Sequence, residues 1–547
     1  MRRKALSREF STRKTVGIAP NSLRSRSSAG IEEKMLSEIR LTDRGSGKKW
    51  EFLRSCRSSQ AILVITTPAL AHRPLHRRKP PLRPLTFCGF SLYFCTWIEL
   101  LKGYIMAKST IKPNHMSINW HDYTGHTEDE PITQASLTVK GSLIGRVGLM
   151  LLSCGTGAWR VRSSMNSMAE YLGVTCTSGI GLTTIDYTCF EGHETYTNSL
   201  SLKNTGVNTH KLDRLERFVR EFPQKGINMS GEQIHCLLDG IEQQKGLYSP
   251  LKLGLAAGFA CGAFTFLLGG GPVEMVCALI GAGCGNYLRS RLLRKQYTLF
   301  MCVILSVALA CLTYVISLRL AETLFSLVSG HEAGYICAML FIIPGFPFIT
   351  SGIDMAKLDM RSGIERLVYA VMIIVIATIT GWVMSMLLGL QPKEFLDFSV
   401  GPVLLPVLRL AASFVGVFGF SLMFNSPVKI AASAAVIGAI ANTFRLELVD
   451  LAGCHTAVAA FFGSLIAGLL ASLLMKWLGY PRISVTVPSI VIMVPGLYLY
   501  RGVYNLGIMS LDASANWLVS ALLIILMLPL GLICARIITD KSFRHCG

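Results

Sequence analysis

Charged residues are scarce in this chain of 547 residues. Asp, Glu, Lys and Arg make up 16% of it, whereas an average soluble domain has about 25%. Hydrophobic residues account for 51%, and the mean hydropathy is +0.46. This composition argues against a water-soluble enzyme. Several apolar stretches of roughly 18 or more residues predict instead a protein that crosses a membrane many times.

Motifs for metals, disulfides and nucleotides are also missing. The 16 cysteines include no Cys-x-x-Cys pair, so the sequence has no zinc ribbon, thioredoxin-type site or disulfide framework. There is no P-loop and no Gly-x-Gly-x-x-Gly, and nothing therefore indicates ATP-driven transport. The spacing of Cys154, Asp186, His193 and His210 does not support a hydrolase triad. We expect no metal, no cofactor and no enzymatic activity.

The net charge of +20 would suit a nucleic-acid-binding protein, but most of it lies in residues 1–105. These hold 21 Lys and Arg against 7 Asp and Glu, a net charge of +14, which leaves +6 for the remainder. The stretch is basic and of low complexity. It fits a basic arm for acidic lipid or nucleic acid, a transit-like presequence, or translation from a start assigned upstream of Met106. We favour the upstream start, and we expect no nucleic-acid partner.

Residues 106–134 read as a flexible segment, and residues 135–248 have the pattern of a small α+β domain. Leu143–Leu172 has the apolar spacing of a helix. Val174–Phe190 and Glu194–Leu202 are rich in Thr and β-branched residues and predict strands. Asn208 can cap one following helix, and Ser230-Gly-Glu-Gln fits the capping box of another.

Ten apolar segments follow Pro250, five in residues 250–390 and five in residues 400–547. In the first segment Gly254, Gly258 and Gly262 recur at four-residue spacing, which allows membrane helices to pack closely. The segments are 252–270, 272–288, 298–318, 334–353, 367–390, 401–423, 427–443, 455–475, 486–508 and 516–535.

The two halves of this region resemble each other. Gly271-Pro-Val-Glu, ending in Asn286-Tyr-Leu-Arg, parallels Ser426-Pro-Val-Lys, ending in Asn442-Thr-Phe-Arg. Because each half has an odd number of segments, the second must enter the membrane from the opposite side. The sequence therefore predicts two inverted five-helix repeats, about ten transmembrane helices, as in many secondary transporters.

A Pro-Gly pair recurs in the fourth and ninth segments, at Pro344-Gly345 and Pro495-Gly496. Proline removes a backbone N–H and glycine lets the chain leave the helix. Broken helices at membrane depth are tolerated where they line a cavity, and their ends can hold a zwitterion or a carboxylate. An ordinary proline kink is the alternative, but its recurrence at matching positions favours a substrate site.

Positive charge predicts the orientation. If the α+β domain is cytoplasmic, the loops on its side hold 13 Lys and Arg, against 3 in the opposite loops (Arg319, Lys393 and Arg445). This asymmetry follows the positive-inside rule. We therefore expect an inner-membrane protein whose α+β domain and C-terminus both face the cytoplasm.

Charged residues near the segment ends are candidates for gating or proton coupling. The charged residues that follow the fourth segment could belong to a solvated loop, or to a gate whose salt bridges exchange partners during transport. Among them, Asp354 lies nearest the membrane. Glu274 opens the second segment, as an interface anchor or a proton relay. The group after the fourth segment contains Asp354, Lys357, Asp359 and Arg361.

Four polar residues inside apolar segments are candidates for substrate binding. Arg409 and Arg501 could each hold a carboxylate through two parallel hydrogen bonds, or extend to the interface instead. Arg501 is the better candidate because it follows Pro495 by six residues. Asn286 and Asn442 occupy matching repeat positions and can hydrogen-bond between helices.

These residues carry a family resemblance. Residues 344–366, from Pro-Gly-Phe-Pro to Ile-Glu-Arg, resemble the characteristic motif of the threonine/serine exporter family, and Leu151–Arg162 with Ala169–Val174 resembles its N-terminal motif. Residues 401–535 resemble the second membrane half, which some members encode as a separate subunit. Arg162 departs from the family, where an acidic residue is frequent. The resemblance implies proton-driven export of small polar amino acids, whereas two-subunit relatives imply dicarboxylate export.

The leading hypothesis is thus a proton-coupled secondary exporter of threonine and serine that works by alternating access. Its partners would be the amino acid or a dicarboxylate such as succinate, protons and the lipid bilayer, with self-association left open. A membrane-anchored enzyme would need a catalytic constellation that the sequence lacks. A channel would not need two matching repeats.

Overall fold

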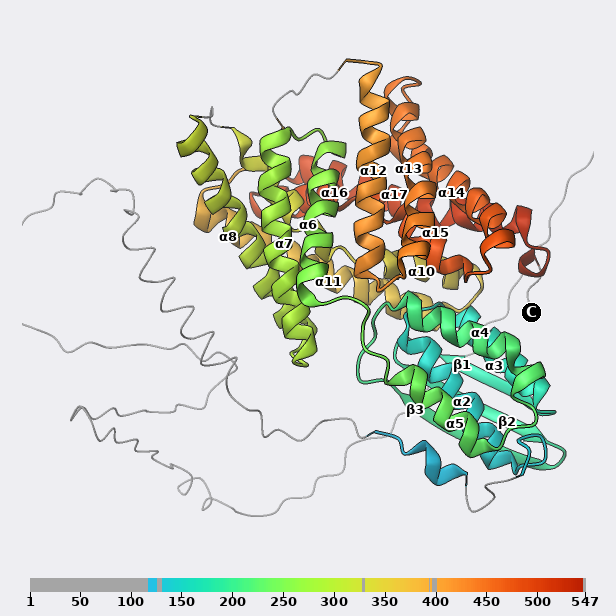
Figure 1. Ribbon diagram of the computed structural model, residues 1–547. Helices are drawn as coiled ribbons and strands as arrows, with labels where there is room; N and C mark the ends of the chain where they lie inside the picture. The colour runs from blue at the N-terminus through green and yellow to red at the C-terminus, as the bar shows by residue number, and fades with distance from the viewer. Residues whose placement is uncertain (1–116, 125–129, 327–329, 393, 396–400, 545–547) are drawn as a thin grey trace, which may run out of the picture. The chain divides into compact units, whose positions relative to one another are not determined.

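The computed structural model describes residues 117–124, 130–326, 330–392, 394–395 and 401–544 (Figure 1). The expectations for residues 1–105, and for 106–116 and 125–129 of the flexible segment, lie outside these described residues. The described residues all belong to one compact unit.

The first part of this unit is a small α+β region. A three-stranded antiparallel sheet, ordered β1-β2-β3, pairs Thr177 with Thr188 and Asp186 with Ser199. Its elements are the 3-10 turn η1 (Trp120–Tyr123), the helices α2 (Leu137–Ser153), α3 (Ala158–Tyr171), α4 (Thr209–Lys225) and α5 (Gly231–Glu242), and the strands β1 (Thr175–Ile180), β2 (Thr184–Glu191) and β3 (Glu194–Ser201).

Two boundaries inside this region differ from the sequence-based expectation. The single helix expected over Leu143–Leu172 is two helices, α2 and α3, because the chain turns at Gly155, which has a φ of +81°. The strand expected over Val174–Phe190 is a hairpin of β1 and β2. Both predicted caps are confirmed, since Asn208 accepts from Lys211 N and Ser230 and Gln233 form a capping box.

Helix α2 packs closely on the sheet. The hydroxyl of Tyr187 on β2 donates to the carbonyl oxygen of Gly141 at 2.9 Å. A Cβ on Gly141 or Gly145 would overlap the rings of Tyr196 or Tyr187. Glycine at these positions therefore lets the aromatic side chains reach the helix backbone, and the buried Tyr187 hydroxyl finds its partner there.

The ten apolar segments predicted from the sequence coincide with helices, but not all qualify as spans. Within the described residues, seven helices are long and apolar enough to cross a membrane, or nine if two bent pairs each count as one span. Helix α7 (Pro272–Arg294) falls short because Glu274, Asn286, Arg289 and two further arginines reduce its hydropathy. The seven are α6 (Pro250–Leu267), α8 (Leu299–Phe325), α11 (Met360–Leu388), α12 (Leu404–Met423), α13 (Val428–Asp450), α14 (Thr456–Leu478) and α17 (Leu511–Thr539).

The glycines of α6 allow its backbone to contact that of α7. A Cβ built on Gly254 would lie 2.8 Å from the carbonyl oxygen of Gly283, and one on Gly258 would lie 2.6 Å from that of Leu279. On the far side of α7, a Cβ on Gly281 would lie 2.8 Å from the carbonyl oxygen of Ala310 on α8. The expectation of close glycine packing is confirmed.

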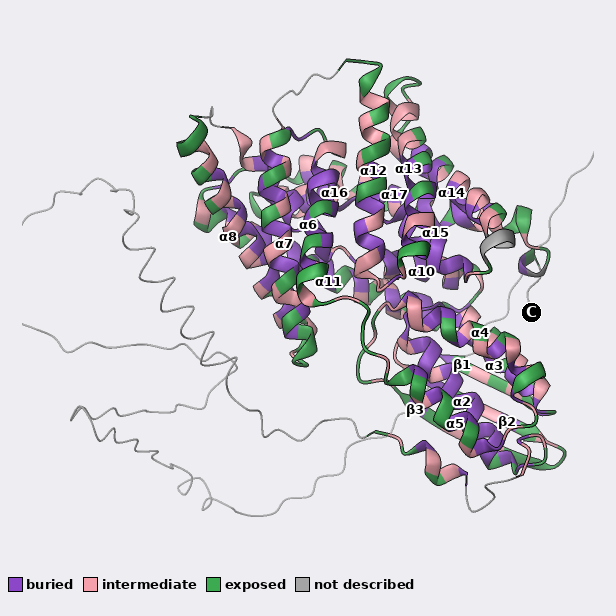
Figure 2. Ribbon diagram, in the orientation of Figure 1, coloured by how far each residue is buried: buried purple, intermediate pink, exposed green. Residues whose placement is uncertain are grey.

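Many residues along the long helices are exposed (Figure 2), and a large share of them are bulky and apolar. Leu320, Val368, Val407 and Leu522 are each more than half exposed. A soluble protein would not leave so much apolar surface to water. This surface is instead suited to the hydrocarbon interior of a bilayer.

Candidate functional site

The two Pro-Gly pairs break their helices in the same way. Pro344 has φ −81° and ψ 59°, and Pro495 has φ −82° and ψ 59°. In each case the glycine N–H donates to the carbonyl oxygen two residues earlier, at 2.9 Å from Gly345 to Ile343 and from Gly496 to Val494. Each proline is thus the centre of an inverse γ-turn.

A new helix begins at each glycine, α10 (Gly345–Ala356) and α16 (Gly496–Gly507). The preceding halves end in 3-10 turns, η3 (Leu340–Ile342) and η4 (Val491–Met493). The bend is 54° at the first break and 45° at the second. The half before the first break contains η2 (His331–Gly334) and α9 (Tyr335–Ala338), and the half before the second contains α15 (Arg482–Ile490).

The two breaks pack against each other reciprocally. A Cβ on Gly345 would lie 3.2 Å from methyl groups of Val491 and Val494, which precede the second break. A Cβ on Gly496 would overlap Ile343, which precedes the first break. Each glycine therefore leaves room for the side chains next to the other break, and the two helix N-termini lie close together.

The surroundings of the breaks are mainly apolar in this conformation. A narrow cavity beside Gly496 is lined by residues such as Leu340, Ile343 and Leu499, and has about 20 Å³ of room for solvent. The hydroxyl groups of Tyr335 on α9 and Tyr500 on α16 are 2.6 Å apart and fully buried. This pair joins the first half of one broken helix to the second half of the other.

The two asparagines predicted as substrate ligands join neighbouring helices. Asn286 on α7 donates to the carbonyl oxygen of Leu253 on α6 at 2.7 Å. Asn442 on α13 donates to Ser413 on α12 at 2.9 Å and accepts from Arg445. Arg445 lies within α13, which extends to Asp450, and not in an outer loop as its sequence position suggested.

The two arginines proposed for carboxylate binding lie in different surroundings. Arg409 pairs with Glu447 at 2.8 Å and with Asp450, so its guanidinium is already neutralised by carboxylates of α13. Arg501 lies on α16, and its guanidinium carbon is 4.9 Å from the ring centre of Trp517 on α17. Of these two, Arg501 belongs to the helix that begins at a break.

Glu274 is buried in the first turn of α7. Its Oε1 atom lies 2.8 Å from Nδ1 of His331, at the start of the first broken helix. Its Oε2 atom is buried and has no hydrogen-bond partner among the described residues. The buried carboxyl and the imidazole of His331 are therefore in direct contact, and an ionisable group buried in a membrane region is a candidate for a functional role.

Asp354, at the end of α10, is fully buried and contacts the α+β region. Its Oδ2 atom accepts from the main-chain N–H of Ala158 at 3.1 Å and from Ser362 at 3.0 Å, and lies 3.2 Å from Nε of Arg366. Ala158 is the first residue of α3, so the carboxylate neutralises the positive end of that helix. Its Oδ1 atom faces Gly157, where a Cβ would lie 2.5 Å away.

Arg366 ties α11 to the same loop. Its two terminal nitrogens donate to the carbonyl oxygens of Gly155 and Thr156 at 3.2 and 2.7 Å. Arg366 as a whole is 2% exposed, and its guanidinium pairs with Asp354. The α2–α3 loop is therefore held between a buried carboxylate and a buried guanidinium of the membrane region.

The remaining charges after the fourth segment also contact the α+β region. Asp359 pairs with Arg162 of α3 at 2.5 Å, which gives the unusual basic residue at that position a partner. Arg361 is exposed and pairs with Asp186 of β2 at 3.1 Å, and this contact keeps the pKa of Asp186, already lowered by its hydrogen bond from Ser199, below its ordinary value. Glu365 accepts from the main-chain N–H of Leu182 at 2.6 Å. These charges form a docking surface and are not a freely solvated loop.

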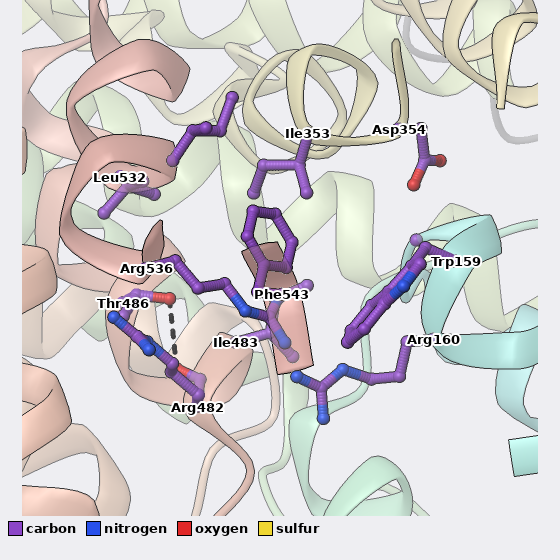
Figure 3. A pocket seen from close by; sticks show the side chains of 12 residues that line it. Trp159, Arg160, Ile353, Asp354, Arg482, Ile483, Thr486, Leu532, Arg536 and Phe543 are labelled. Carbon is purple, nitrogen blue, oxygen red and sulfur yellow. Dashed lines mark hydrogen bonds between the residues drawn. The ribbon is translucent and has the colours of Figure 1, made fainter. Parts of the chain in front are cut away.

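A cavity opens beside this docking surface (Figure 3). Arg160 and Trp159 reach it from α3, Arg482 from α15 and Arg536 from α17, with Ile353 and Asp354 above them. The ring of Phe543, from the turn η5 (Ser542–Arg544), lies in the middle. Lys357 donates to the carbonyl oxygen of Phe543 at 2.8 Å.

Several of these residues were not singled out by sequence reasoning. Tyr335 and Tyr500 are tyrosines within apolar segments, and a buried tyrosine hydroxyl needs a partner, so they carried a usable signal. Arg160, Arg482 and Arg536 come from three distant parts of the chain. Their sequence positions, near helix ends, are those of ordinary interface arginines, and only the fold brings them together.

Comparisons with known proteins agree with this architecture. Residues 142–389 match the family described as "Putative threonine/serine exporter", and residues 409–538 match the family described as "Threonine/Serine exporter, ThrE". A probable threonine/serine exporter of Mycobacterium tuberculosis is 24% identical over 419 residues, covering 74% of this chain and 77% of the relative.

Two further relatives match a smaller share of the chain. A probable succinate transporter subunit of Escherichia coli is 24% identical over 44% of this chain and 90% of its own length, and one of Klebsiella aerogenes is 25% identical over 44% and 89%. No solved structure matches the chain. This is a multi-pass membrane protein, as the family matches and the apolar helices both indicate. The chain belongs to the threonine/serine exporter family, with both family regions in one polypeptide.

Proposed function

We propose that the protein exports threonine and serine by proton-driven secondary transport, with alternating access between two inverted five-helix repeats. The observation that carries this proposal is the reciprocal packing of the two Pro-Gly breaks. Gly345 lies against the residues before the second break, and Gly496 against those before the first. Two matching broken helices that meet in this way are typical of transporters built from inverted repeats.

The breaks also supply a substrate site. The first turns of α10 and α16 begin at Gly345 and Gly496, and their N–H groups carry the partial positive charge of a helix N-terminus. A substrate carboxylate would bind there, next to the Tyr335–Tyr500 pair and Arg501. Asn286, Asn442 and Arg409, which already bind neighbouring residues, would maintain the helix packing around this site.

Two charged clusters would couple substrate movement to protons and gating. Glu274 and His331 lie at the end of α7 opposite Arg294, and the buried carboxyl can take up or release a proton as the repeat moves. Asp354, Lys357, Asp359 and Arg361 would hold the opposite entrance closed through their contacts with the α+β region and η5. With the α+β region and C-terminus in the cytoplasm of an inner membrane, this entrance would face the cytoplasm.

Succinate or a similar dicarboxylate is the second candidate substrate. Two relatives are named as probable succinate transporter subunits. The two helix N-termini and the guanidinium of Arg501 could together bind the two carboxylates of such a solute. The match to exporter families favours transport over the hypothesis of a membrane-anchored enzyme.

Gradient-driven uptake into proteoliposomes tests the proposal. The purified full chain is reconstituted, a pH gradient is imposed, and entry of labelled L-threonine, L-serine and succinate is measured with and without a protonophore. Threonine or serine entry that the protonophore abolishes supports the proposal. Entry of succinate alone would mean that the same mechanism exports dicarboxylates and not amino acids. If none of the three solutes enters, the proposal is contradicted.

A further inference from the structure

The cavity of Figure 3 has an excess of positive charge on its walls. Its lining contains three guanidinium groups, those of Arg160, Arg482 and Arg536, and among the described lining residues one carboxylate, that of Asp354. Asp354 is held by Arg366, Ser362 and Ala158 and is turned toward the α2–α3 loop. Arg160 pairs with Glu216 at 2.6 Å and Arg536 with Asp540 at 3.4 Å, and neither of these carboxylates is among the lining residues. The described cavity wall therefore carries three guanidinium groups and only one carboxylate, which is held by other partners.

The hydrogen bonds of Arg482 and Arg536 leave much of their positive charge without a carboxylate partner. Arg482 donates to the hydroxyl of Thr539 at 3.0 Å and to the carbonyl oxygen of Gly468 at 3.1 Å, both neutral acceptors. Arg536 donates from Nε to the carboxylate of Asp540 at 3.4 Å, one residue beyond the end of α17, and among the described residues its terminal nitrogens make no hydrogen bond to a carboxylate. Several guanidinium groups gathered away from water are unfavourable unless an anion joins them.

An aromatic clamp closes the same cavity. The guanidinium carbon of Arg536 lies 4.3 Å from the ring centre of Trp159 and 4.4 Å from that of Phe543. The two rings are 5.7 Å apart and nearly perpendicular. Phe543 is 5% exposed, and with its ring in place the cavity has about 40 Å³ of room for solvent, enough for about three waters. A solute the size of an amino acid would have to displace the ring.

We propose that this cavity is an entry site that binds the carboxylate of the exported solute before it reaches the Pro-Gly breaks, with Arg482 and Arg536 as its ligands and Phe543 as a displaceable lid. Arg160 raises the local positive potential from the α+β side, where it pairs with Glu216 at 2.6 Å. Arg482 begins α15 and Arg536 lies near the end of α17, so a carboxylate bridging them would contact both sides of the second membrane half. The inference rests on the proposed function, because it identifies the first site at which the exported solute would bind.

Trp159 offers a direct binding test that does not require transport. The full chain in detergent is titrated with L-threonine, with succinate and with L-threoninol, which lacks the carboxylate, while tryptophan emission is followed. We expect threonine or succinate to change the emission and threoninol to have no effect. The change should be lost in Trp159→Phe, which identifies the reporter among the 7 tryptophans.

Arginine variants then locate the ligands. We expect Arg482→Gln and Arg536→Gln to weaken carboxylate binding by about tenfold each, the loss of one charge-assisted hydrogen bond. Arg536→Lys should retain part of the affinity. Arg217→Gln is the matched control, because this exposed arginine of α4 pairs only locally with Asp213 and lies outside the cavity. Phe543→Ala should strengthen binding severalfold relative to Phe543→Leu, because the lid no longer competes with the solute.

The outcomes separate this inference from the proposed function. A Trp159 response to threonine or succinate, weakened by the arginine variants, supports the entry site even if gradient-driven uptake fails. Equal responses to threoninol and threonine, or affinities unchanged in both arginine variants, overturn it even if uptake succeeds.

Discussion

The carboxylate of Asp354 caps helix α3 of the α+β region through the main-chain N–H of Ala158, 3.1 Å away. Asp354 lies in the last turn of α10, the helix that begins at the first Pro-Gly break. Any movement of α10 in the transport cycle must therefore move α3 with it or break this hydrogen bond. The α+β region is thus mechanically joined to the broken helix.

Gly157→Ala should uncouple this joint. The added Cβ would lie 2.5 Å from Oδ1 of Asp354, and neither the buried carboxylate nor the α3 N-terminus can retreat easily. We expect uptake to fall by about tenfold, which corresponds to roughly 1.4 kcal/mol, while the protein still inserts into membranes. Gly206→Ala is the control, since its Cβ would meet nothing within 4 Å. Equal activity of the two variants would show that the joint is not needed.

Arg162 and Asp359 should be energetically coupled. Each of the single variants Arg162→Asp and Asp359→Arg places like charges together, whereas the double variant restores an opposite pair. Because Arg162 is one-third exposed, the coupling should be about 1 kcal/mol or less. A double-mutant cycle on the thermal unfolding midpoint measures it. Strictly additive effects would mean that the contact contributes nothing.

Gly496→Ala should be more damaging than Gly345→Ala. A Cβ on Gly496 would overlap Ile343, whereas one on Gly345 would lie 3.2 Å from two valine methyl groups that can shift. Ile343→Ala in the same chain should recover part of the activity lost in Gly496→Ala by removing the overlapping atoms. Initial uptake rates, normalised to reconstituted protein, give the comparison. A reversed order, or no recovery, would argue against the packing of the two breaks.

Protonation of His235 should destabilise the α+β region in mild acid. Burial, together with the nearby Arg146 guanidinium, lowers the pKa of His235 to about 4 from an ordinary value of 6.5. The unfolded chain therefore binds this proton first, and the stability that depends on neutral His235 is lost as the pH falls from about 6.5 toward 4. Ser142, His121, Glu232 and Asp239 are the other polar groups near it.

Protonation of His121 affects stability in the opposite direction to protonation of His235. The experiment therefore compares variants that leave His121 unchanged. Its hydrogen bond to Asp239 raises its pKa, so its contribution is present at low pH and lost as the pH rises. Thermal unfolding of the full chain at pH 7 and 5 is therefore compared between wild type and His235→Gln. We expect the acid-induced decrease to be smaller in the variant, and unchanged in His193→Gln, which alters an exposed histidine.

Apolar periodicity and local motifs predict much of this fold because they act within one helix or turn. The polytopic helical class, the α+β region, the Asn208 and Ser230 caps and the breaks at Pro344 and Pro495 are of this kind. Helix α7 shows where hydropathy alone is insufficient. It packs among the other long helices, but its buried Glu274 and its arginines make it too polar to be recognised as a membrane span.

Long-range contacts account for what could not be predicted. Asp354 meets Ala158 across 196 residues, and Tyr335 meets Tyr500 across 165. Charges such as Asp359 and Arg361 look the same in sequence whether they are solvated or docked. The unusual Arg162 gave a hint, because a reversed charge implies a partner of opposite sign, but nothing local identified Asp359 as that partner.

Counterflow of threonine tests the account most directly. Proteoliposomes that contain the full chain are loaded with unlabelled L-threonine, and the entry of labelled L-threonine is followed without any pH gradient. Alternating access at the paired breaks predicts a transient accumulation of label above the outside concentration, strongly reduced in Gly496→Ala. Entry that never exceeds equilibration, at a rate independent of internal threonine, would indicate a channel and contradict the account.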